Sequence, residues 1–123
     1  MQNIGTQMLL KSAEEDHRNF VIKTLADAER TPPAARAQDI PDHHQCSFGQ
    51  WYETSGAALL GESAAFKALA LPHAQLHTAA RELIQAAQAG DRQRLPQLTA
   101  ALLEQEKRIL ALLHDLSKSL DAA

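Results

Sequence analysis

The sequence is poor in aromatic residues, in cysteine and in concentrated positive charge. Aromatic residues make up 4% of the 123 residues and hydrophobic residues 45%, many of them Ala and Leu. Ala and Leu lose little on entering a helix, and the β-branched residues that favour strands are few. The single cysteine excludes an internal disulfide. We therefore expect an all-α fold in a single domain, residues 1–123.

Charge and hydropathy exclude several classes of partner. The formal net charge is −3, and Lys and Arg form no basic stripe of the kind that neutralises phosphates in nucleic-acid binders. No apolar run approaches the ~20 residues of a spanning helix. Residues 1–16 lack the basic leader and apolar core of a secretory signal. We expect a cytoplasmic domain with no nucleic-acid partner and no direct membrane insertion.

The first helix is expected over residues 2–29, because apolar positions recur there at three- and four-residue steps and so share one face. This inward face comprises Leu10, Ala13, His17, Phe20, Val21, Thr24 and Ala28. Pro32 and Pro33 end the helix, since proline cannot follow helical backbone without a clash. Residues 30–41 are expected to form a loop.

Two shorter helices are expected in the middle of the chain. Asp42 is the expected N-cap of the first, because Gln45 completes a capping-box pattern with it. This helix is expected to end near Gly56. Ser63 is the expected cap of a second short helix that runs through Leu71.

Two longer helices are expected in the second half. Pro72, suited to a first helical position, opens one that ends at Gly90, and the other spans residues 92–120. The last helix carries two adjacent apolar seams. The first comprises Leu95, Leu98, Leu102, Ile109, Leu112 and Leu116, and the second Leu103, Leu110, Leu113 and Leu120. Two seams present more apolar surface than one small core needs to bury, which indicates a homodimer. The alternative is that both seams form one wide stripe that is buried within the bundle.

Six histidines are numerous for a chain of this length. His73 and His77 are four residues apart, so their imidazoles lie on one helical face and can contact one ion. His77 and His17 fall on the inward stripes of their helices. A single buried histidine is usually satisfied by a hydrogen bond in the core. Three buried histidines leave several buried ring nitrogens that need partners, and a metal ion is such a partner.

Cys46 completes the predicted site. Isolated cysteines are often inert core residues, but Cys46 falls in the first turn of a predicted helix, whose dipole favours the thiolate. Gly49, one turn later, cannot crowd the site, and its cost in a helix indicates close approach of a neighbouring helix. Trp51 belongs to the aromatic part of the core beside it. Three imidazoles and one thiolate form a closed tetrahedral set suited to one Zn²⁺.

Three further histidines are less suited to the site. His43 and His44 precede Cys46 and are alternative ligands, although histidines in a loop or cap are commonly exposed. His114 lies between leucines of the last helix and is expected to be packed or at the rim.

The segment around Cys46 resembles a known motif. Residues 46–51, Cys-Ser-Phe-Gly-Gln-Trp, are similar to the Cys-x-[Leu/Phe]-Gly-x-Trp motif of the chemoreceptor zinc-binding domains. His17 upstream and Leu-Pro-His-Ala-Gln-Leu-His at 71–77 resemble the family's other ligand segments in order and approximate spacing. The resemblance covers about residues 11–116, which we take as the core of the domain.

The resemblance implies a fold, a site and a role. The fold is an antiparallel up-and-down four-helix bundle with an additional short helix, commonly dimeric. The zinc ligands carried over to this chain are His17, Cys46, His73 and His77. Such domains are attached to bacterial chemoreceptors and to diguanylate cyclases, whose output they regulate. They are thought to respond to zinc, or to oxidants such as hypochlorous acid through the zinc-bound cysteine, here Cys46.

No output module is expected in this chain, which contains neither a cyclase domain nor a coiled-coil signalling hairpin. We therefore expect a stand-alone member of the family or an excised regulatory domain. A catalytic zinc keeps an open position and a base nearby, whereas four protein ligands close the shell, so we expect no enzyme activity. The alternative to a sensor is a purely structural, zinc-stabilised helical dimerisation module.

Overall fold

The prediction of an all-α fold is confirmed by a computed structural model, which describes residues 4–30 and 36–122. Within these residues there are helices and turns but no strand. Three helices are long: α1 (Ile4–Glu29), α5 (Ala70–Gln88) and α6 (Leu95–Ala122). Between α1 and α5 lie five short ones. They are η1 (Ala37–Asp39), α2 (Ser47–Trp51), the π-helical turn η2 (Tyr52–Gly56), α3 (Ala57–Leu60) and α4 (Ala64–Ala68).

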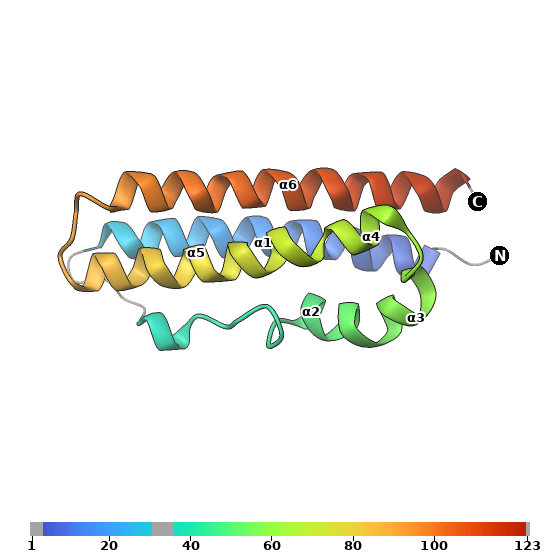
Figure 1. The fold of residues 1–123 in the computed structure, drawn as a ribbon, viewed down its shortest axis with the longest axis horizontal. Helices are drawn as coiled ribbons and strands as arrows, with labels where there is room; N and C mark the ends of the chain where they lie inside the picture. Colours follow the sequence, from blue (N-terminus) through green and yellow to red (C-terminus); the bar gives the residue numbers. More distant parts are fainter. Residues whose placement is uncertain (1–3, 31–35, 123) are drawn as a thin grey trace.

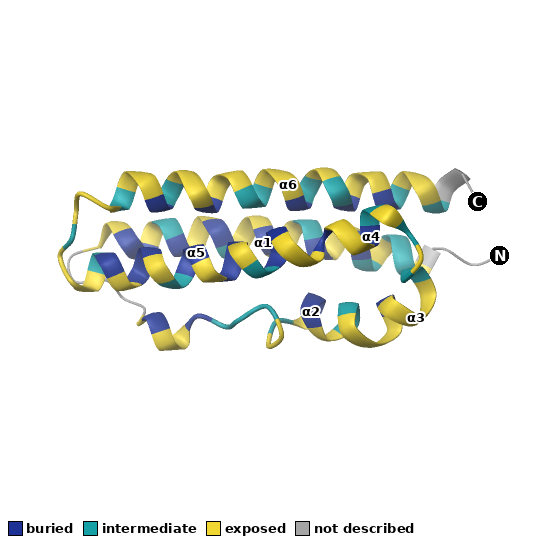
Figure 2. Cartoon of the chain, viewed as in Figure 1, coloured by how far each residue is buried: buried dark blue, intermediate teal, exposed yellow. Residues whose placement is uncertain are grey.

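The three long helices lie side by side and enclose the core (Figure 1). Figure 2 shows α6 exposed on its outer side, with its buried residues turned toward α1 and α5. The side chains that this packing removes from water most completely are aliphatic. They are Leu10, Val21, Leu69, Leu76, Leu83, Ile84, Leu102, Ile109, Leu113 and Leu116. Burial of this apolar surface is the main force that holds the helices together.

Four of the short helices, η1, α2, η2 and α3, form a broken path along the remaining side of the molecule (Figure 1). Its first part is tied to α5, because Arg81 Nε donates to the Ile40 carbonyl at 2.8 Å. Its last part is tied to α4, because Tyr52 stacks on Phe66 with ring centroids 4.0 Å apart. Between these ties, α2 makes its extensive backbone contacts only with η2. Side chains therefore hold α2 in place.

The cap predicted for this path was wrong by four residues. Asp42 does accept from the backbone N–H groups of His44 and Gln45, and the Gln45 side chain accepts from the Asp42 N–H. These reciprocal bonds close a turn, and the helix begins later, with Cys46 as its N-cap. The expected end near Gly56 was also wrong, because η2 leads directly into α3.

The second short helix and the start of α5 agree more closely with the sequence. Ser63 is the N-cap of α4, and its hydroxyl accepts from the Phe66 N–H. Helix α4 ends at Ala68 rather than Leu71, and α5 follows almost without interruption. Pro72 lies in the first turn of α5, where a missing N–H costs little.

Gly90 ends α5 as predicted. Its φ is +73°, and the Asp91 and Gly90 N–H groups donate to the carbonyls of Ala86 and Ala87. This is a Schellman motif. Helix α6 begins at Leu95 rather than residue 92, because residues 91–94 form turns. Pro96 lies in its first turn.

The two seams of α6 are unequal. Within the first, Leu98, Leu102, Ile109 and Leu116 are buried; within the second, only Leu113 is. Leu103 of the second seam is 43% exposed. The wide-stripe alternative therefore accounts for part of the apolar surface, and the homodimer remains a prediction. In the described part of the chain, no helix has the length and apolarity to span a membrane.

Replacing Gly90 with Ala tests the end of α5. An added Cβ meets nothing within 4 Å, so the only cost is the left-handed backbone, and we expect the free energy of unfolding to fall by about 1 kcal/mol. Chemical denaturation measures this change. Gly5→Ala is the control, because Gly5 also has open space but no positive φ. An equal loss of unfolding free energy in both variants would contradict the assignment of the cost to the left-handed backbone at Gly90.

Candidate metal centre

Three separate elements bring the four predicted ligands together. His17 comes from the middle of α1, His73 and His77 come from successive turns of α5, and Cys46 caps α2. One ligand atom from each of the four lies within 4.8 Å of every other, and the three imidazoles are buried. Within the described residues, these are the only three or more His, Cys, Asp or Glu side chains grouped closely enough to hold a metal.

Hydrogen bonds fix which ring nitrogen faces the centre. His17 Nδ1 is 2.7 Å from the Ala13 carbonyl, and His77 Nδ1 is 2.8 Å from the Pro41 carbonyl. A carbonyl oxygen only accepts, so each Nδ1 carries the proton and donates. The Nε2 atoms of both rings are therefore unprotonated, as a metal ligand requires. Such backbone partners also fix the orientation of a ligating ring.

The inner face of the site fits a cation. His77 Nε2 is buried and has no hydrogen-bond partner among the described residues. A buried polar atom without a partner costs free energy, which a bound cation removes. His73 Nε2 lies 3.2 Å from Cys46 Sγ, close to the edge of about 3.5 Å expected between nitrogen and sulfur on a tetrahedral zinc.

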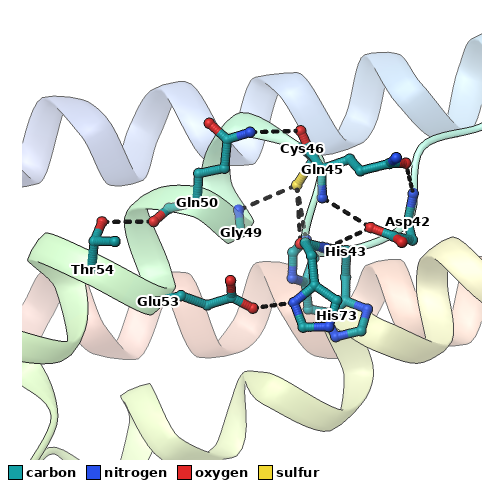
Figure 3. Close-up of polar contacts among 10 residues, drawn as sticks. Asp42, His43, Gln45, Cys46, Gly49, Gln50, Glu53, Thr54 and His73 are labelled. Atoms are coloured by element: carbon teal, nitrogen blue, oxygen red, sulfur yellow. Dashed lines mark hydrogen bonds and ion pairs between the residues drawn. The ribbon is translucent and has the colours of Figure 1, made fainter.

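Cys46 lies at a helix terminus, as its N-cap rather than in the first turn. The Gly49 N–H donates to its sulfur at 3.3 Å, as Figure 3 shows. The terminus does favour the thiolate, but that effect is the smaller one. Burial raises the pKa of the Cys46 thiol, and the N–H groups of Gly49 and Phe48 only partly offset the increase. A bound cation is what stabilises the thiolate.

The three histidines are held in the neutral form that binds metals. Burial lowers the pKa of His73 to about 3, with a further contribution from the neighbouring histidines. Burial also lowers the pKa of His77 to about 4, although its bond to Pro41 opposes the shift. Burial lowers the pKa of His17 as well. All three rings are therefore available to a cation at neutral pH.

Gly49 supports the site, but not for the predicted reason. A Cβ at this position would lie 1.7 Å from the His43 carbonyl oxygen and 3.4 Å from Cε1 of His73. The closest approach therefore comes from the 42–46 turn, and the neighbouring helix α5 comes near only through the His73 ring. Glycine lets this turn fold over α2 and bring Cys46 to His73.

Aromatic residues cover one side of the imidazoles. Phe48 packs edge-on against both His17 and His73, with centroids 5.4 and 5.1 Å away. Trp51 is half-buried and lies 5.7 Å from Phe48, so it supports the site through that ring. Phe48 was expected with Trp51 in the aromatic part of the core, but its direct contact with two imidazoles was not predicted. Its place in the motif between Cys46 and Gly49 could have indicated it.

The other three histidines lie outside the cluster. His43 is half-buried, and its ring centroid is 5.8 Å from that of His73. His44 is exposed and pairs with Glu53. His114 is exposed on α6 and lines a pocket with Leu10 of α1, so it lies at the rim rather than packed in the core.

Comparison with known proteins agrees with this geometry. A helical domain in which three imidazoles and a thiolate converge is a zinc-binding domain by the chemistry of its donors. The family model of the chemoreceptor zinc-binding domain matches residues 17–84, more than half of the chain and a span that contains all four residues. The chain belongs to this family, and its cofactor is zinc. Searches of curated proteins and of solved structures gave no match.

Replacing Gly49 with Ala tests the close approach. The added Cβ displaces the His43 carbonyl and with it Cys46, so we expect zinc affinity to weaken by about tenfold or more. Competition titration with a chelator measures the change. Ser47→Ala is the control, because Ser47 is exposed on the same short helix. Unchanged affinity in Gly49→Ala would contradict the role of this glycine.

The protonation states predict how zinc binding depends on pH. The imidazoles are neutral and the Cys46 thiol is protonated at neutral pH, so binding should release about one proton. Affinity should rise about tenfold per pH unit from about pH 6.5 to 8.5. Calorimetry in buffers of different ionisation enthalpy counts the protons. Release of two or more would show that the imidazoles are not held neutral.

Proposed function

We propose that His17, Cys46, His73 and His77 are the four ligands of one zinc ion, and that this site makes the chain a sensory domain. The observation that carries the assignment is the buried Nε2 of His77, which has no hydrogen-bond partner in the described part of the chain and belongs to the group whose ligand atoms lie within 4.8 Å of one another. Zinc has no redox chemistry of its own, and holding the thiolate is what it supplies here. The sensed signal is the zinc level or the oxidation of Cys46.

The four ligands differ in how firmly the fold holds them. The three histidines stand on long helices that share the core. Cys46 stands on α2, which has five residues and no extensive backbone contact with the long helices. A bond from its sulfur to the ion is therefore a main attachment of this segment. When that bond is lost, α2 is the element free to move.

Oxidation breaks the same attachment. Hypochlorous acid takes two electrons from the Cys46 thiolate, which becomes a sulfenic acid as chloride leaves. A sulfenic acid is a poor zinc ligand, so zinc loss and oxidation produce the same release of α2. The family name associates such domains with chemoreceptors. We propose that the receiving protein is a chemoreceptor or a diguanylate cyclase that sets cyclic-di-GMP output.

The same proposal includes an architecture. Figure 1 supports an antiparallel up-and-down bundle with four members. These are α1, the broken path from η1 to α3, α4 with α5, and α6. The exposed leucine of the second seam, Leu103, supports a homodimer through α6.

Four protein ligands leave no open position for a reacting water, which supports binding rather than catalysis. A cytoplasmic location follows from the free thiol that the sensor needs.

A structural role for zinc is the second candidate, because the ion also cross-links three segments. Affinity separates the two functions. A sensor exchanges zinc within the range of free zinc in the cell, whereas a structural site stays loaded at any level that the cell reaches.

Metal analysis tests the ligand set. We expect one zinc per wild-type chain, and a loss of affinity of about a hundredfold or more in Cys46→Ala, because a ligand bond is removed. His114→Ala is the matched control for loss of a histidine, since His114 lies on the exposed side of α6. Full zinc retention by Cys46→Ala would contradict the ligand set.

Graded oxidation tests the switch. Zinc released to a chromogenic chelator should rise in step with Cys46 sulfenic acid, measured by mass spectrometry, while fluorescence of Trp51, the only tryptophan, reports the movement of α2. Oxidised thiol with the metal still bound and unchanged fluorescence would leave only the structural role.

A further inference from the structure

A row of side chains that can bind a metal ion leads from the surface to the metal centre. His44 and Glu53 form an ion pair, and their side chains are 60% and 43% exposed. The His44 ring lies against that of His43, with centroids 4.0 Å apart and planes tilted by 39°. His43 in turn lies beside His73. Two imidazoles and a carboxylate therefore lie between solvent and the buried ring of His73.

The spacing from His43 to His73 is that of side chains able to share one ion. Within the metal centre, the ring centroids of the three histidines are 4.9, 5.1 and 6.2 Å apart, with planes at 84° to 88°. The His43 and His73 rings are 5.8 Å apart at 86°. The His43 ring is therefore closer to that of His73 than the rings of His17 and His77 are to each other.

The backbone fixes this arrangement, and charge favours it. The His43 carbonyl is packed against Gly49, and Asp42 accepts from the His44 N–H at 2.9 Å. Asp42 and Glu53 place two carboxylates at the outer end of the row of side chains. Local negative charge raises the concentration of a divalent cation and its rate of capture.

We propose that Glu53, His44 and His43 form the route by which zinc reaches and leaves the metal centre. The inference rests on the proposed ligand set. A closed four-ligand shell has no vacant position, so exchange requires an outer group that holds the ion as one inner ligand lets go. His43 is that group for His73. Glu53 and His44 capture the ion from solvent and pass it to His43.

A route of this kind changes rates without changing equilibrium affinity, because it lowers the barrier equally for uptake and release. A ligand that holds the ion in its resting place changes affinity instead. The two roles therefore differ in a measurement that compares rates with the dissociation constant.

Stopped-flow kinetics with zinc chloride, and with a chromogenic chelator for release, tests the route. We expect uptake and release to slow together by about tenfold in Glu53→Gln, His44→Ala and His43→Gln, with an unchanged dissociation constant. His114→Ala is the matched control and should behave as wild type. Circular dichroism verifies that the variants fold.

Three results would overturn the proposal. The first is unchanged rates in all three variants. The second is faster release with weakened affinity, which would make these side chains holding ligands. The third is slowing confined to Asp16→Asn, which would place the route at the cavity between α1 and α2 that Asp16, Ser47 and Trp51 line. Wild-type protein that binds no zinc contradicts the proposed function and the route together, whereas intact binding with unchanged rates contradicts the route alone.

Discussion

The burial of three imidazoles in one small region is the constraint on which the rest of the structure depends. His17, His73 and His77 are each at most 4% exposed, among Leu, Ala and Phe side chains that offer them no polar partner. Backbone carbonyls satisfy the outer nitrogens of His17 and His77, and Cys46 Sγ lies 3.2 Å from His73 Nε2. The inner nitrogens then converge on a centre that a divalent cation satisfies better than any arrangement of hydrogen bonds.

The molecule accordingly has two parts. Core packing holds the three long helices, and the proposed zinc ion helps to hold the segment with Cys46. The long helices bury a continuous aliphatic core and carry the three imidazoles. The segment with Cys46 offers the fourth donor of the group and makes no extensive backbone contact with those helices. Under the proposed function, a change in one bond, at one sulfur, alters one face of the domain while the long helices stay packed. This is a suitable device for a sensor.

The sequence predicted the core helices and the inward direction of the histidines because both depend on periodicity. His17 and His77 share their faces with buried aliphatic residues, so their inward direction followed from the helical repeat. The path from residue 37 to 68 was less predictable, since its structure depends on tertiary contacts. Asp42 and Gln45 form a capping pattern that a turn satisfies equally well.

Two further features could not be read from the pattern. Gly49 was recognised as special, but only coordinates show that the carbonyl of His43 occupies the space of its side chain. His43 and His44 were considered as competing ligands, and the structure instead places them in line between Glu53 and His73. Histidines next to each other in sequence say nothing about which neighbour their rings approach across the fold.

X-ray absorption at the zinc edge tests the central claim most directly, because it measures the number and kind of atoms around the ion. The account predicts one sulfur at about 2.3 Å and three nitrogens at about 2.0 Å, in a four-coordinate site without a water ligand. A shell with no sulfur, or one containing water oxygen in place of an imidazole, would contradict it.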